Sequence, residues 1–181
     1  CILKNMKQAL AIQALDRFAR QNRVVFTVGD LAKVFQESGQ ALQATLARLV
    51  RAKILTRAAR GVYVYGLDIT PKPNLLEQVA VALRRGHYNY VSLESALSEY
   101  GAISQVPVDR LTVMTTGRSG EYRTPWGVIE FTHTKRGIDQ LLRNTKDVGR
   151  GLRLAQAETA WRDLKRVGRN THLVDMEEIE E

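Results

Sequence analysis

Residues 27–65 read TVGDLAKVFQESGQALQATLARLVRAKILTRAARGVYVY, and they predict two short helices followed by a hairpin. Thr27 is a favourable N-cap for the first helix, and Asp30 suits the positive end of the helix dipole. That helix ends before a break at residues 36–39, and a second helix follows to about Ala52. The second helix is predicted because its leucines recur at the spacing of one buried stripe.

A hairpin is expected after the helices. Ile54–Arg57 and Val62–Tyr65 are rich in the β-branched and aromatic residues of strands, and a tight turn joins them. Upstream, residues 6–20 predict an amphipathic helix and residues 23–26 a short extended segment. The apolar stripe of that helix is predicted to contain Leu10, Ala14, Leu15 and Phe18. This order of elements is typical of a winged helix-turn-helix, in which the last helix enters the major groove of DNA.

The predicted recognition helix presents a neutral or basic face. Because Leu42, Leu46 and Leu49 face the core, the remaining positions face outward. Glutamine can pair with adenine and arginine with guanine, while arginines of the hairpin can reach phosphates. The predicted DNA-binding residues are Ser38, Gln40, Gln43, Ala44, Arg48, Arg51, Arg57 and Arg60. The alternative is a protein-binding module with a merely solvated helix, but such a face is usually mixed in charge.

The charge of the chain is concentrated at its start. The 181 residues carry a net charge of +8, and residues 1–70 hold 11 Lys and Arg against 4 Asp and Glu. Residues 71–181 hold 16 against 15, so the first segment is the better anion binder. Thr70-Pro71-Lys72-Pro73 is a stiff connection. We therefore expect a DNA-binding domain over residues 1–70 and a second domain over residues 71–181.

The second domain is predicted to mix helices and strands, which gives an α+β fold overall. Helices are expected over Leu75–Arg85, Leu93–Tyr100 and Leu154–Val167, and strands over Tyr88–Val91, Leu111–Thr116 and Val128–Thr134. Gly117–Gly127 is expected to be the loop between two of these strands. Trp126 and Trp161 are interpreted as core aromatics.

Few features of the sequence indicate catalysis, metal binding or cofactor binding. One cysteine allows no disulfide framework within the chain, which fits the cytoplasm, and no apolar run has the length of a membrane span. The three histidines lack metal-ligand spacing, so no metal, cofactor or catalytic residue is expected. Residues 115–120, TTGRSG, could cradle a phosphate, although a flexible turn is the simpler interpretation. A weaker alternative is that Arg118 and Arg123 contact the DNA backbone.

Several motifs resemble one known family. The hairpin end Arg60-Gly-Val-Tyr63, the segment Tyr90–Gly101 (YVSLESALSEYG) and the segment Val113–Thr134 with its WGVIE turn are similar to the AbiEi family of antitoxins. The chain departs from the family's usual helix at Ala155–Leu164, which reads AQAETAWRDL.

The resemblance implies a bifunctional antitoxin of a type IV toxin–antitoxin system in abortive infection, a form of phage defence. Its first domain would bind double-stranded promoter DNA and repress its own promoter. Its second domain would oppose a nucleotidyltransferase-like toxin without a stable complex. The oligomeric state is left open, with a dimer on DNA as the first candidate. One alternative is an unrelated winged-helix regulator with a ligand-sensing second domain, and another is an enzyme acting at the loop of residues 116–123.

Overall fold

The computed structural model describes residues 7–66, 74–104 and 109–180. The chain forms two compact units, Cys1–Pro73 and Asn74–Glu181. The boundary expected between residues 70 and 71 lies outside the described residues. Each unit mixes helices and strands, so the α+β fold class predicted from the sequence is confirmed.

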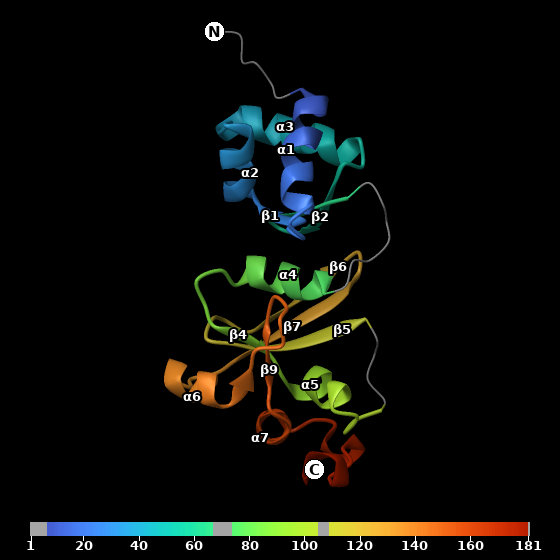
Figure 1. Cartoon of the computed structure of the whole chain (residues 1–181), viewed down its shortest axis with the longest axis vertical. Coiled ribbons are helices and arrows are strands. Elements are labelled where there is room, and N and C mark those ends of the chain that lie inside the picture. Colours follow the sequence, from blue (N-terminus) through green and yellow to red (C-terminus); the bar gives the residue numbers. More distant parts are fainter. Residues whose placement is uncertain (1–6, 67–73, 105–108, 181) are drawn as a thin grey trace. The chain divides into compact units, whose positions relative to one another are not determined.

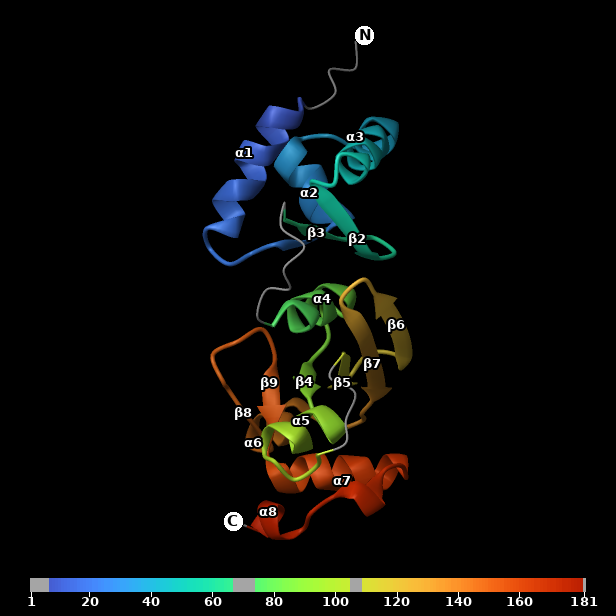
Figure 2. The same cartoon turned by 90° about the vertical axis from the view of Figure 1, so that its right-hand side faces the viewer.

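The N-terminal unit has three helices on one side of a small sheet (Figure 2). Its elements are α1 (Gln8–Ala19), β1 (Val25–Thr27), α2 (Val28–Phe35), α3 (Gly39–Arg51), β2 (Leu55–Ala59) and β3 (Val62–Tyr65). The strands pair antiparallel in the order β1-β3-β2. This is the element order that residues 6–65 predict for a winged helix-turn-helix.

Local sequence fixes where the helices of this unit begin. Thr27 and Asp30 form a capping box: the amide of Asp30 donates to the hydroxyl of Thr27 (3.2 Å), and the amide of Thr27 donates to the Asp30 carboxylate (2.9 Å). Between α2 and α3 the backbone is left-handed at Gln36 (φ 53°) and again at Gly39 (φ 56°). The two reversals make the turn that swings α3 away from α2, and glycine adopts such a φ without strain.

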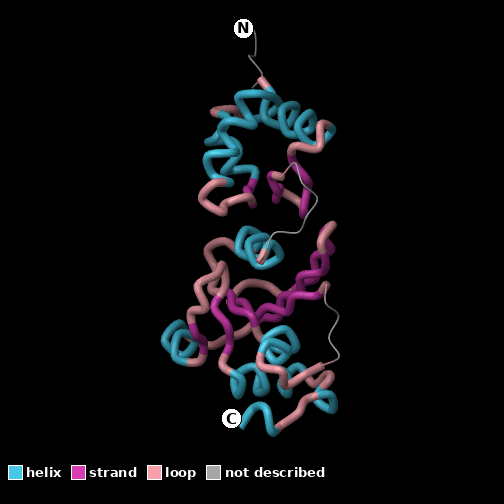
Figure 3. The backbone as a smooth tube through the Cα atoms, turned by 45° about the vertical axis from the view of Figure 1, so that its right-hand side comes forward, coloured by secondary structure: helices cyan, strands magenta, loops and turns pink. Residues whose placement is uncertain are grey.

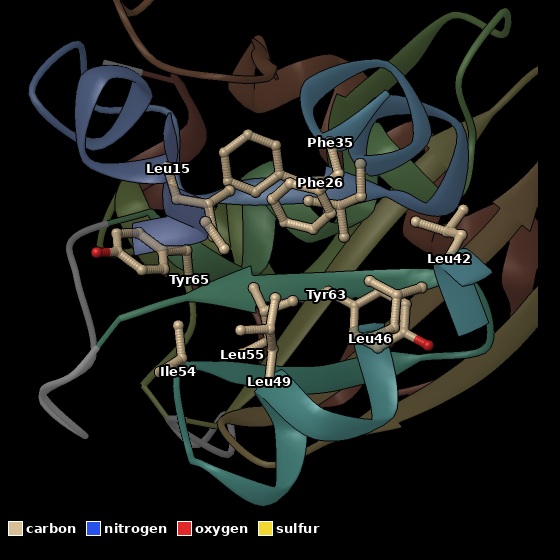
Figure 4. Packing of buried hydrophobic residues seen from close by; sticks show 12 residues of the cluster. Leu15, Phe26, Phe35, Leu42, Leu46, Leu49, Ile54, Leu55, Tyr63 and Tyr65 are labelled. Carbon is tan, nitrogen blue, oxygen red and sulfur yellow. The ribbon is translucent and has the colours of Figure 1, made fainter. Parts of the chain in front are cut away.

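The core of this unit lies between the helices and the sheet (Figure 4). Leu42, Leu46 and Leu49 of α3 are all buried, as the periodicity predicts, and they meet Leu55 and Tyr63 of the hairpin. The stripe predicted for α1 is wrong at one position. Leu10 is 52% exposed while Ala11 and Leu15 are buried, so the buried face of α1 is rotated by one residue.

The C-terminal unit is a mixed six-stranded sheet with helices on both faces (Figures 1 and 3). Its helices are α4 (Leu75–Leu83), α5 (Leu93–Glu99), α6 (Ile138–Arg143), α7 (Ala157–Val167) and α8 (Glu177–Glu180), with a short 3-10 turn at Thr171–Leu173. Its strands are β4 (Asn89–Val91), β5 (Arg110–Thr115), β6 (Gly120–Thr124), β7 (Gly127–His133), β8 (Thr145–Lys146) and β9 (Arg153–Ala155). The sheet order is β6-β7-β5-β4-β9-β8, and α4 lies on the face opposite α5 and α7.

Three expectations for this unit are wrong. The loop expected at Gly117–Gly127 contains strand β6, which pairs antiparallel with β7. The helix expected from Leu154 begins at Ala157, because the residues before it form β9 and pair parallel with β4. Trp126 and Trp161 are only half-buried and are not the centre of the core. At β9 a long-range strand pairing overrides the local helical pattern.

Candidate nucleic-acid interface

The outward face of α3 is formed by residues that recur three and four positions apart. Gln40, Gln43, Ala44, Ala47 and Arg51 are exposed, opposite the buried leucines of the same helix. At about 100° per residue they span roughly a quarter of the helix circumference. The face contains amides, methyl groups and one guanidinium, which are groups that read base edges in the major groove.

Ser38 and Arg48 lie at the borders of this face. Ser38 is the exposed N-cap of α3, and its hydroxyl makes no capping hydrogen bond. Arg48 is half-buried, at the side of the helix nearer the core. Arg51 in the last turn is the more accessible of the two arginines on α3.

The hairpin is short and firmly held. Strand β2 carries a bulge at Ala58, which is buried, and Arg57 next to it is exposed. Only Arg60 and Gly61 form the turn, with Gly61 in a left-handed conformation (φ 77°). The amide of Val28 donates to the carbonyl of Gly61 at 3.0 Å, so the turn is attached to the start of α2. A wing this short presents Arg57 and Arg60 as its cations.

Three arginines of this surface lack a carboxylate partner within the described residues. No carboxylate there forms an ion pair with Arg51, Arg57 or Arg60. Two acidic residues of the unit have other partners. Asp30 belongs to the capping box and contacts Arg23 at 3.2 Å, and Asp16 accepts a hydrogen bond from the hydroxyl of Tyr65. Arg51, Arg57 and Arg60 are therefore available to an anionic partner.

The Tyr65–Asp16 hydrogen bond also stabilises the unit. Burial, the hydrogen bond to Asp16 and the negative charge of that carboxylate together raise the pKa of Tyr65 from 10.0 to about 12. The bond joins β3 to α1, which are 49 residues apart in sequence. The hydroxyl of Tyr65 therefore anchors the first helix to the sheet beneath α3.

In the C-terminal unit, buried ion pairs replace the free cations. Asp163 of α7 is fully buried and contacts the guanidinium of Arg136, and its carboxylate also accepts from Ser92 (2.8 Å) and Tyr90 (3.1 Å). Burial and the charge of Asp163 raise the pKa of Tyr90 to about 12, against the opposing effect of Arg136. The sequence analysis missed this cluster, and only an acidic residue within the apolar stripe of α7 hinted at it.

A second ionic network crosses the same unit. Arg169 clamps Glu94 with two hydrogen bonds of 2.7 and 3.2 Å and contacts Glu130 at 2.7 Å. Burial alone would raise the pKa of Glu94, but the hydrogen bonds from Arg169, its own backbone amide and Asn170 outweigh burial and lower it. These contacts pair acidic with basic side chains, whereas the sequence alone shows only that the two kinds are nearly equal in number.

The sequence predicts neither a metal site nor a membrane-spanning segment. Across residues 7–66, 74–104 and 109–180, no group of three or more His, Cys, Asp or Glu side chains could hold a metal ion. Within the same residues, no helix is long and apolar enough to cross a membrane.

The element order of the N-terminal unit is the one that the sequence predicts for a winged helix-turn-helix. Residues 13–66 match the family described as "Transcriptional regulator, AbiEi antitoxin". The resemblance inferred from the sequence is thereby confirmed for the N-terminal unit. The match ends before the C-terminal unit, so the similarity inferred for Tyr90–Gly101 and Val113–Thr134 stays a prediction.

Known structures and sequences add a further comparison. The fold is similar to the crystal structure of the RV2827C protein from Mycobacterium tuberculosis, with a TM-score of 0.60, 16% identity, and coverage of 98% of this chain and 72% of that chain. At that identity the likeness concerns the fold alone. No curated protein sequence matches this chain.

Proposed function

We propose that this chain is a DNA-binding transcriptional regulator that represses its own promoter and acts as the antitoxin of a type IV toxin–antitoxin system. The observation that carries the proposal is the exposed face of α3, whose residues are neutral or basic and whose Arg51 has no carboxylate partner among the described residues. The match of residues 13–66 to antitoxin regulators supports it. Such a regulator acts on promoter DNA in the cytoplasm.

The proposed contacts divide between base reading and phosphate binding. Gln40, Gln43, Ala44, Arg48 and Arg51 would face base edges in the major groove. The proposed phosphate-binding residues are Ser38, Arg57 and Arg60, which lie at the start of α3 and on the hairpin. Phosphate contacts hold the protein on DNA without reading its sequence.

Binding of the full chain to its own upstream DNA tests the DNA-binding part. We expect Arg51→Ala to weaken operator binding by about 1–3 kcal/mol and to reduce the preference over random DNA. Arg60→Ala should weaken both DNAs alike and reduce the salt slope by about one unit. Arg20→Ala, an exposed arginine after α1, is the control for loss of charge. Equal affinity of the unmutated chain for upstream and random DNA would contradict the proposal.

The antitoxin part needs a separate experiment. The full chain is expressed beside a nucleotidyltransferase-type toxin under an unrelated promoter, so that repression cannot account for rescue. Growth should recover with the unmutated chain and with Arg51→Ala, because toxin neutralisation is proposed to reside in residues 71–181. Failure of the unmutated chain to restore growth would contradict the antitoxin part of the proposal.

A further inference from the structure

The C-terminal unit contains a surface pocket lined by cationic and polar side chains. It has a volume of about 670 Å³ and is lined by Leu83, Arg84, Arg85, His87, Thr116, Gly117, Arg118, Ser119 and His133. The lining thus combines three arginines, two histidines and two hydroxyls, and it contains no carboxylate. Its walls come from the end of α4, the turn between β5 and β6, and the end of β7.

Arg84 is held rigidly at this pocket. Its guanidinium lies 4.4 Å from the ring centre of Phe131 and 5.0 Å from that of Tyr122. It donates to the carbonyl of Arg118 (2.9 and 3.1 Å) and to the hydroxyl of Tyr122 (2.9 Å). These partners fix the position of the charge without neutralising it, since no carboxylate of the described residues pairs with Arg84. A fixed cation binds an anion with little loss of side-chain entropy.

The turn that carries Arg118 is also preorganised. The amide of Gly117 donates to the hydroxyl of Thr115 (3.0 Å), and the amide of His133 donates to the hydroxyl of Ser119 (2.8 Å). The carbonyl of Gly117 can only accept, so Nδ1 of His133, 2.8 Å away, carries the proton and Nε2 remains for another partner. A side chain at Gly117 would lie 3.1 Å from the ring of His87, so glycine permits this close approach.

The arginines of this unit divide into those that contact carboxylates and those, such as Arg153 and Arg162, that contact none among the described residues. Arg110, Arg123, Arg136, Arg150 and Arg169 all contact carboxylates. The side chains of Arg84 and Arg118 have no such partner within the described residues. An alternative role for Arg84 is to cap the end of α4, where it donates a hydrogen bond to the carbonyl of Leu83 (3.2 Å). Capping does not account for the position of Arg118 at the pocket or for the absence of acidic residues from its lining.

We infer that this pocket binds the phosphate group of a small phosphorylated molecule. Guanidinium groups and hydroxyls are the usual partners of phosphate oxygens. The volume lies in the range of small-molecule sites and exceeds the need of a lone phosphate, so a phosphate ester of nucleotide size fits best. The site is independent of the proposed DNA-binding surface, because every lining residue belongs to the C-terminal unit.

Calorimetric titration of the full chain with adenosine monophosphate and with inorganic phosphate tests the inference. We expect saturable binding of both, with the nucleotide the tighter. Arg118→Gln should weaken nucleotide binding about tenfold, the loss expected for one charge-assisted hydrogen bond. Arg118 is exposed and its side chain has no partner among the described residues, so this variant is expected to fold. The matched control is Arg123→Gln, which removes the same charge from an 81% exposed side chain outside the pocket and should change affinity less than twofold.

Three results would overturn the inference. The first is an absence of saturable binding at concentrations up to about 10 mM. The second is equal weakening in Arg118→Gln and Arg123→Gln, which indicates a general charge effect. The third concerns a parallel titration with a short DNA duplex: if Arg118→Gln weakens only DNA binding and leaves nucleotide binding unchanged, the pocket contacts the DNA backbone instead.

Discussion

The two units use their charges in opposite ways. In the N-terminal unit an apolar core with one tyrosine–aspartate hydrogen bond supports three exposed arginines, Arg51, Arg57 and Arg60, which contact no carboxylate of the described residues. In the C-terminal unit several charges form internal ion pairs, among them Arg136 with the buried Asp163 and Arg169 with Glu94. Net charge alone would assign all anion binding to the first unit. The second, nearly neutral, unit nevertheless brings Arg84 and Arg118 to one pocket, and the lining of that pocket contains no carboxylate.

The largest expected effect concerns the buried pair of the C-terminal unit. Asp163→Ala leaves Arg136 without its partner, and we expect a loss of about 3–5 kcal/mol in the free energy of unfolding, typical of breaking a buried ion pair. Hydrogen exchange read separately for each unit measures it, with the loss confined to the C-terminal unit. Asp139→Ala, at an exposed residue, is the control and should cost under about 1 kcal/mol. A small loss in Asp163→Ala would mean that the pair does not hold this unit together.

The hydrogen bond between Tyr65 and Asp16 in the N-terminal unit is expected to contribute less to the free energy of unfolding, and its contribution depends on pH. Tyr65→Phe should cost about 1.5–3 kcal/mol, the worth of a hydrogen bond to a charged group. The pKa of Tyr65 is raised to about 12, so its contribution is present below pH 10 and is lost as the pH rises from 10 to 12. Unfolding of the variant should lack this alkaline loss.

The matched control for that experiment lies on the same strand. Tyr63 is buried in the same core (Figure 4). Its hydroxyl makes no hydrogen bond within the described residues. Tyr63→Phe should therefore leave both the stability and its alkaline profile nearly unchanged. An equal effect in the two variants would show that the Asp16 bond contributes nothing specific.

The capping box is expected to matter less. Thr27→Ala removes the acceptor for the amide of Asp30 and should destabilise the N-terminal unit by about 1 kcal/mol. Thr27→Ser keeps the hydroxyl and should restore most of that stability. Thermal unfolding of the full chain followed by helix content compares them. Equal stability of the alanine and serine variants would mean that the Thr27 hydroxyl does not stabilise α2.

The smallest effect is expected from an exposed pair. Arg123 and Glu121 lie 3.2 Å apart, and the arginine side chain is 81% exposed. Arg123→Ala should change the stability by less than about 0.5 kcal/mol, since exposed ion pairs contribute little. Urea denaturation of this variant beside Asp163→Ala separates the buried from the exposed charges of one unit. A cost above about 1 kcal/mol would contradict the distinction between them.

The sequence by itself determined most of the N-terminal unit. Its apolar residues recur at helical and strand periods over short segments, so the buried leucines of α3 and the exposed positions between them follow from 3.6 residues per turn. The capping box and the two-residue turn at Arg60 and Gly61 are likewise local. The prediction for α1 is wrong at Leu10, where the neighbouring Ala11 is buried instead. The spacing of apolar residues defines the buried side of a helix only to within about one residue.

Only the tertiary structure decided the C-terminal unit and its pocket. Strand β9 forms because it pairs with β4, which lies far away in the sequence, and no local pattern records that pairing. Asp163 is buried because Arg136, Tyr90 and Ser92 surround it, and a sequence shows such partners only as separate polar residues. The pocket brings together segments near residues 84, 118 and 133, which are far apart in the sequence. Charge pairing is a property of distances in space, and composition cannot supply them.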